Sequence, residues 1–223
     1  MFPLRDTQPS YSKPVITVLI IVINLLIFLF EISLDPYTRN AFIGTYGLVP
    51  DHFDTVSLLT SMFLHGGWMH VLGNMWFLWI FGDNIEDILG KGKYLLFYLL
   101  CGAAAGLTQL LSNPYSRIPT VGASGAIAGV MGAYLIKFPH SRIYTLVFVL
   151  FFITTIDIPA WIMLLYWLGI QFFNGVGTIG YSHVSEGGGV AFFAHVGGFL
   201  AGVALINLMA PRERFSRRQD LYW

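Results

Sequence analysis

Long apolar runs constrain this chain more than any other feature. The first runs from Val15 to Phe30 and is interrupted only by Thr17 and Asn24. A run of this length can cross the hydrocarbon core of a bilayer as one helix. Of the 223 residues, 56% are hydrophobic and only 11% are charged, too few charges to cover the surface of a soluble globule. We therefore predict an integral, multi-pass membrane protein.

Further apolar runs predict the remaining spans. They cover about Val56 to Phe81, Tyr94 to Leu111, Ser124 to Lys137, Ile143 to Phe173 and Ala191 to Ala210. The segment from Ile143 to Ile156 is short for a crossing, so it lies along the inner interface, dips in and returns, or begins one long tilted fifth span. We predict an all-α polytopic membrane protein, a six-transmembrane-helix bundle. It forms a single domain over residues 1–223, with its core at about residues 14–210.

The segments between the spans carry the charges that orient them. We expect a loop over residues 32–55, which is rich in turn formers, and a turn over residues 83–93. With a cytoplasmic N-terminus and six crossings, ten of the twelve lysines and arginines lie in inner segments, and only Arg39 and Arg117 lie outside. This is the distribution that the positive-inside rule predicts. We expect both termini to be cytoplasmic, in a plasma membrane of the bacterial type.

The formal net charge also limits the class of partner. Because it is zero, the chain offers no basic face for nucleic acid, and we expect no nucleic-acid partner. The expected partner is the lipid bilayer, together with other membrane proteins.

Three of the predicted spans carry polar side chains in their outer halves. They are His70 and Asn74 in the second span, Ser124 at the start of the fourth and His195 one turn into the last. Such groups are costly in a membrane, so they should face the bundle interior or a water-filled cavity. The three spans run in the same direction, which places these groups at a similar depth. A serine hydroxyl needs a base to become a strong nucleophile, and histidine suits that role at neutral pH.

The residues around Ser124 allow two interpretations. Gly122 and Gly125 leave the backbone free to turn tightly and to expose N–H groups that can hold a developing negative charge. Small residues at every fourth position, such as Gly125 and Gly129, are also typical of closely packed membrane helices. The case for a catalytic serine therefore depends on its partners elsewhere in the chain.

Three segments together resemble one known family. His70-Val-Leu-Gly-Asn74, Gly122-Ala-Ser124-Gly125 and Ala194-His195-Val-Gly-Gly198 match, in order and spacing, the signature of the rhomboid intramembrane serine proteases. The resemblance covers about residues 58–210. It implies a rhomboid-type bundle in which Ser124 is the nucleophile and His195 its base. It also implies an oxyanion site formed by His70, Asn74 and the Ser124 backbone N–H, and single-span membrane proteins as substrates.

The surroundings of His195 depart from the family pattern. Relatives often carry an aromatic residue at the position of Ala128, where it stacks on the histidine. His195 must then be steadied by packing against Gly129 and Gly198 or by another ring. The nearest acidic residues on the outer side lie in loops well before His70 and His195. We therefore expect a Ser–His dyad without a carboxylate. The first loop also lacks the Trp-Arg pair of many relatives, which leaves its anchoring open.

Three other function classes fit the sequence less well. A metal site of His65, His70 and His195 lacks an H-E-x-x-H motif and a carboxylate within a turn, so we expect no metal and no cofactor. A six-span transporter would need polar groups through the full depth, whereas the inner halves of these spans are largely apolar. A catalytically silent rhomboid-like protein that binds transmembrane helices is the alternative that the intact Ser124 and His195 argue against. Substrate-binding residues and the oligomeric state are not indicated.

Overall fold

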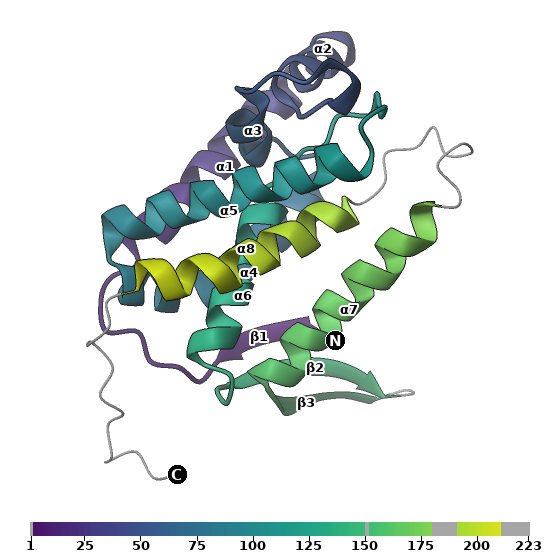
Figure 1. The fold of residues 1–223 in the computed structure, drawn as a ribbon. Helices are drawn as coiled ribbons and strands as arrows, with labels where there is room; N and C mark the ends of the chain where they lie inside the picture. The colour runs from purple at the N-terminus through teal and green to yellow at the C-terminus, as the bar shows by residue number, and fades with distance from the viewer. Residues whose placement is uncertain (1, 150–151, 180–190, 211–223) are drawn as a thin grey trace.

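The computed structural model describes residues 2–149, 152–179 and 191–210. Its helices are α1 (Val15–Ser33), α2 (Pro36–Tyr46), α3 (Ser57–Thr60), α4 (Trp68–Leu89), α5 (Lys91–Ser112), α6 (Ser124–Lys137), α7 (Ala160–Ile179) and α8 (Phe192–Met209), with 3-10 turns η1 (Pro50–His52) and η2 (Ser61–Phe63). The strands are β1 (Phe2–Asp6), β2 (Arg142–Val149) and β3 (Phe152–Pro159). Figure 1 shows α5 and α8 crossing in front of α6, with the small sheet at one end of the bundle. The predicted helical bundle is confirmed, and the sheet is an addition to it.

Four helices in the described part of the chain are long and apolar enough to cross a membrane. They are α1, α5, α7 over its residues Ala160–Gly177, and α8. Helix α6 is apolar but has 14 residues, and α4 has 22 residues with several acids near its end. Both would have to cross to give six spans, so that number stays a prediction.

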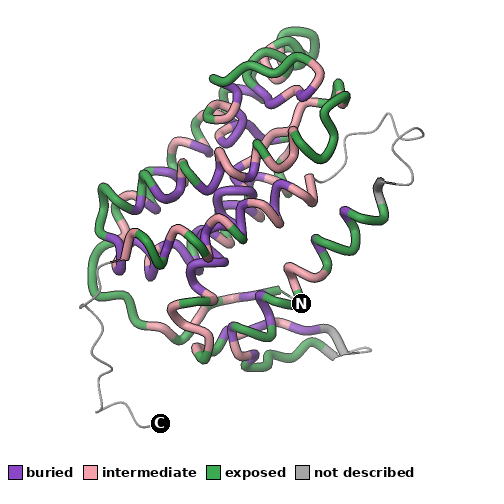
Figure 2. Tube along the Cα trace, viewed as in Figure 1, coloured by how far each residue is buried: buried purple, intermediate pink, exposed green. Residues whose placement is uncertain are grey.

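Helix α6 occupies the centre of the bundle. Every residue from Gly125 to Tyr134 is buried, and Figure 2 shows the buried segments gathered on the central helices. A Cβ atom on Gly198 would collide with the carbonyl oxygen of Gly125, and one on Gly202 would collide with that of Gly129. The backbones of α6 and α8 therefore touch, as they do where small residues recur every four positions. Gly198 and Gly202 are thus the close-packing positions of α8.

The second predicted span is wrong in its bounds. Residues 57–63 form the short helices α3 and η2, residues 64–67 are irregular, and α4 begins only at Trp68. It then continues to Leu89, through most of the segment expected as a turn. Hydropathy alone misplaced this helix because its outer end is preceded by apolar loop residues and its inner end carries acids.

A buried acid in that inner end connects α4 to α1. Glu86 is almost fully buried, and its carboxylate accepts hydrogen bonds from the backbone N–H groups of Ile16 and Thr17 at 2.9 and 2.8 Å. The Thr17 hydroxyl donates a third at 2.9 Å. These are N–H groups of the first turn of α1, which have no partner within their own helix and attract negative charge. Glu86 thus fixes the start of α1 against α4.

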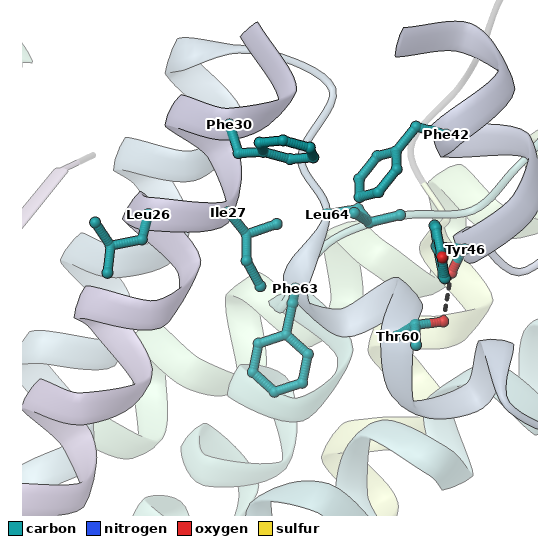
Figure 3. A pocket seen from close by; sticks show the side chains of 8 residues that line it. All are labelled: Leu26, Ile27, Phe30, Phe42, Tyr46, Thr60, Phe63 and Leu64. Atoms are coloured by element: carbon teal, nitrogen blue, oxygen red, sulfur yellow. Dashed lines mark hydrogen bonds between the residues drawn. The ribbon is translucent and has the colours of Figure 1, made fainter. Parts of the chain in front are cut away.

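The segment over residues 32–55, expected as a loop, contains α2. Asp35 caps this helix by accepting hydrogen bonds from the backbone of Tyr37 and Thr38, and Pro36 occupies its first position. Between α1, α2 and the α3–η2 segment lies an apolar pocket of about 340 Å³, shown in Figure 3. Its lining residues are Leu26, Ile27, Phe30, Phe42, Tyr46, Thr60, Phe63 and Leu64. The apolar side chains around this pocket hold α2 against α1.

The ambiguous segment after α6 is a β-hairpin. Strands β2 and β3 pair antiparallel from Arg142 with Pro159 to Val149 with Phe152, and β1 joins the edge of β2. The segment is rich in β-branched and aromatic residues, which favour strands. It returns to the end of the bundle from which it left, so the long tilted fifth span is wrong. In the described residues, α7 is the one helix between α6 and α8.

Contacts at the two ends agree with the predicted topology. At the sheet end, the Tyr11 backbone N–H donates to Asp87 at 2.8 Å, and Lys93 donates to the Met209 carbonyl at 3.3 Å. At the other end, the Arg117 guanidinium lies 2.9 Å from Asp51. Segments predicted to be inner thus meet at one end, and segments predicted to be outer meet at the other.

Candidate active site

Ser124 is the first residue of α6, where a tight turn enters the helix. The turn is possible because Gly122 has φ +125°, a conformation that other residues rarely adopt. The Gly122 N–H donates to the Ser61 carbonyl at 2.9 Å, and Thr120 pairs with Leu48. The outer segments around α3 and η2 therefore hold the turn in place. The Ser124 N–H lies in the first helical turn, where it has no partner four residues back.

His195 lies beside Ser124 because α8 packs closely on α6. The distance from His195 Nε2 to Ser124 Oγ is 2.7 Å, the length of a hydrogen bond. Gly125 follows the serine directly, and Gly198 comes one helical turn after the histidine. Since these two glycines touch, the small residues that pack the helices also set the distance between the two reactive side chains.

His70 turns its Nε2 atom toward the same turn. Its Nδ1 atom accepts a hydrogen bond from the Gly66 N–H at 3.4 Å, so the neutral ring carries its proton on Nε2. A Cβ atom on Gly122 would lie 2.6 Å from that Nε2 atom and 3.5 Å from Asn74 Nδ2. The glycine thus leaves a space into which both donors point.

Asn74 is positioned by a buried histidine. The Asn74 amide donates to His65 Nε2 at 3.0 Å, which leaves its second N–H for the site. His65 is fully buried, and its backbone N–H donates to the Glu31 carboxylate at 3.2 Å. Through these contacts His65 links Asn74 to Glu31 at the end of α1.

Two residues of α7 that the sequence analysis missed complete the surroundings of His195. Gln171 Oε1 accepts a hydrogen bond from His195 Nδ1 at 2.7 Å. The Trp167 ring lies 5.6 Å from the imidazole, centroid to centroid, at an interplanar angle of 37°. Of the two expected ways to steady His195 without an aromatic at position 128, the second is observed, because another ring packs on it.

The four predicted site residues line one cavity of about 860 Å³. Ser124, His195, His70 and Asn74 come from α4, α6 and α8, and Gln171 and Trp167 add α7 to the lining. In the described part of the chain, no group of three or more His, Cys, Asp or Glu side chains is placed to hold a metal ion. The arrangement joins a serine hydroxyl, an imidazole beside it and two hydrogen-bond donors around a space large enough for a peptide segment and water.

Comparison with known proteins places the chain in a family. Residues 52–212 match the Rhomboid domain. The chain belongs to the rhomboid family. Similar curated proteins include Rhomboid protein 1, mitochondrial, of Saccharomyces cerevisiae, 29% identical over 187 residues that make up 80% of this chain and 50% of the yeast protein. RHOMBOID-like protein 6, mitochondrial, of Arabidopsis thaliana is 34% identical over 161 residues, 70% of this chain and 45% of the plant protein.

A third relative bears on activity. Rhomboid protease GluP of Bacillus subtilis is 36% identical over 128 residues, 56% of this chain and 25% of that protein. This rhomboid chain thus spans half or less of the length of the three relatives. The rhomboid family includes serine intramembrane proteases. The apolar helices of this chain make it an integral membrane protein.

Proposed function

We propose that this rhomboid protein is an intramembrane serine endopeptidase. It hydrolyses a peptide bond in or near the transmembrane segment of another membrane protein through a Ser124–His195 dyad. The observation that carries the proposal is the 2.7 Å contact between Ser124 Oγ and His195 Nε2 inside a cavity that His70 and Asn74 also line. Family membership supports the same reaction class.

The dyad performs acyl transfer in two steps. Ser124 Oγ attacks the carbonyl carbon of the scissile bond while its proton passes to His195 Nε2. His195 then gives that proton to the nitrogen of the leaving amine, and an acyl-enzyme ester on Ser124 remains. A water molecule, deprotonated by the same Nε2 atom, hydrolyses the ester and restores the serine.

Three donors would stabilise the negative charge that develops on the carbonyl oxygen. They are His70 Nε2–H, the free N–H of Asn74 and the backbone N–H of Ser124. Preorganised donors of this type act strongly in a water-poor site because they need no reorganisation when the charge forms. The space beside Gly122, which a Cβ atom would fill, is the place for the oxyanion.

The location of the site determines which substrates can react. A helix in lipid keeps its carbonyl groups hydrogen-bonded within itself, so a segment must unwind locally before Ser124 can reach one. Segments with Gly, Pro or other helix-weakening residues near the cut should therefore be preferred. With both termini in the cytoplasm, cleavage occurs toward the outer leaflet.

A serine-directed fluorophosphonate tests the proposal without a known substrate. The probe should label the purified wild-type protein in detergent and should not label Ser124→Ala or His195→Ala. Labelling that persists in Ser124→Ala would assign the reaction to another nucleophile. Absence of labelling in a folded wild-type protein would favour the catalytically silent alternative.

A further inference from the structure

The proposed dyad leaves unexplained how His195 keeps its Nε2 atom free to accept a proton. A neutral imidazole carries one proton, on Nδ1 or on Nε2. If it sits on Nε2, the ring cannot take the serine proton. In serine proteases a buried acid usually fixes this choice, but among the described residues no carboxylate hydrogen-bonds to Ser124 or His195.

The contact at Nδ1 comes from Gln171. Its Oε1 atom lies 2.7 Å from His195 Nδ1, and the Gln171 side chain is 8% exposed, so water competes little for the bond. A carbonyl oxygen only accepts, and this contact therefore requires the proton on Nδ1. It leaves Nε2 as the acceptor that faces Ser124 Oγ at 2.7 Å.

One face of α7 also holds the imidazole ring of His195 in position. Trp167 and Gln171 are four residues apart, so both project from one side of α7. Trp167 packs on the His195 ring and also lies 6.4 Å from Phe199, centroid to centroid. Helix α7 thus fixes the position of the imidazole with an aromatic ring and its tautomer with an amide.

We propose that Gln171 is a positioning residue of the dyad, which holds His195 in the Nδ1–H tautomer and stabilises the imidazolium that forms during attack. This inference rests on the proposed peptidase function and adds a third residue to it. An amide suits the site because it holds the neutral ring without the desolvation cost that a carboxylate unpaired with an imidazolium would carry at this depth. The amide dipole supplies the hydrogen bond without a charge.

Substitutions at position 171 separate this role from simple packing. Gln171→Leu keeps a similar volume but removes the acceptor, and it should lower kcat on the order of 10- to 100-fold, as loss of one buried hydrogen bond does, with little change in KM. Gln171→Glu keeps the Oε1 acceptor and should restore turnover. Asn174→Ala removes an exposed amide from the same helix and serves as the matched control, with unchanged kcat.

The pH dependence of kcat/KM provides a second readout, which a purely packing role of Gln171 would not change. A carboxylate at position 171 favours the imidazolium, so the acidic limb of kcat/KM for Gln171→Glu should shift to higher pH than in the wild type. Among the described residues, His70 on α4 is the other titratable side chain that acts on His195, and it is the same in all variants. An unmoved limb together with failure of Gln171→Glu to restore turnover would overturn the proposal.

The tautomer can also be measured without catalysis. Nitrogen NMR of histidine-labelled Ser124→Ala protein, with the His195 signal assigned by its loss in His195→Ala, should show the proton on Nδ1. Adding Gln171→Leu should move the signal toward a mixture of tautomers, and an unchanged signal would refute the inference. Peptidase activity that persists in Ser124→Ala would instead refute the proposed function, whereas full activity in Gln171→Leu would refute only the role of Gln171.

Discussion

At the scale of single residues, the site depends as much on missing side chains as on reactive ones. Gly122 has φ +125° and leaves the space that His70 and Asn74 face. Gly125 lets α8 come close enough for His195 to meet Ser124. These glycines leave Ser124 open to the cavity and within hydrogen-bond distance of His195.

The two oxyanion donors should matter for turnover far more than for folding. His70→Ala and Asn74→Ala should each lower kcat by about 10² to 10³, equivalent to about 3 to 4 kcal/mol in the transition state, because these donors act when charge develops. Initial rates of cleavage and melting curves in detergent measure the two effects separately. Leu72→Ala, which truncates an exposed side chain of the same helix, is the control.

Substrate capture completes this test. In a Ser124→Ala background, either donor variant should still bind a single-span substrate, because the ground-state carbonyl needs these donors little. Loss of capture, or of the folded protein, would show that His70 or Asn74 has a structural role instead.

The sequence predicted the residues that meet in the candidate site only where they belong to short motifs. Ser124, His195, His70 and Asn74 stand in three short patterns of recognisable spacing, and the structure brings all four to one cavity. Gln171 and Trp167 carry no such local mark. Their contact with His195 depends on where α7 begins and which face it turns inward. The start of α7 is held by hydrogen bonds from the Ala160 and Trp161 N–H groups to the Ser141 and Pro139 carbonyls.

At the scale of secondary-structure elements, the contact between α6 and α8 holds the dyad together. Gly202→Ala should destabilise the protein by about 1 to 3 kcal/mol, because the added Cβ collides with the backbone of Gly129 and neither helix can give way easily. Gly169→Ala on α7 meets no atom within 4 Å and is the matched control. Thermal unfolding in detergent compares them, and equal melting temperatures would contradict the close packing.

The N-terminal strand should make stability depend on pH through Asp6. Burial raises the pKa of the Asp6 carboxyl above its ordinary value of 3.8, and the hydrogen bond from Tyr134 opposes this only in part. The folded state therefore favours the protonated acid. Its contribution to stability is fully present below pH 3.8 and is lost as the pH rises through the raised folded-state pKa.

Asp6→Asn tests this dependence because it keeps an acceptor for Tyr134 and removes the charge. Its melting temperature should match the wild type in the acid range and exceed it increasingly as the pH rises above 3.8. A variant that is less stable than the wild type at neutral pH would show that the charged carboxylate is itself stabilising.

Some helices could be predicted from hydropathy, and other elements could not. Helices α1, α5, α6 and α8 lie close to their predicted bounds, because each is a single uniform apolar run. An apolar strand and an apolar helix look alike by hydropathy, so the hairpin over residues 142–159 was left open. The extended end of α4 buries Glu86 against the start of α1, about 70 positions away in the sequence, a contact that hydropathy does not reveal.

At the scale of the whole molecule, the arrangement of the two ends predicts which loops face outward. Tyr115 lies at the end with Arg117, and His140 lies at the end with the sheet, and both are exposed. In a Cys101→Ala background, Tyr115→Cys should react with a membrane-impermeant thiol reagent from outside intact cells. His140→Cys should react only after permeabilisation.

The site requires this topology, because an odd number of membrane crossings must separate α6 from α8. His195 reaches Ser124 from the correct side only if the chain between α6 and α8 crosses once, and the described residues there contain one long helix, α7. The same accessibility at positions 115 and 140 would contradict both the six-span arrangement and the outer location of the dyad.

The cleavage of a tagged single-span membrane protein by purified enzyme in detergent tests the central claim most directly. The wild-type protein should cut a substrate whose transmembrane segment contains Gly or Pro near the middle. Ser124→Ala, His195→Ala and the double variant should all be inactive to nearly the same degree, because the two residues act as a unit. Equal cleavage by the wild type and Ser124→Ala would contradict the account.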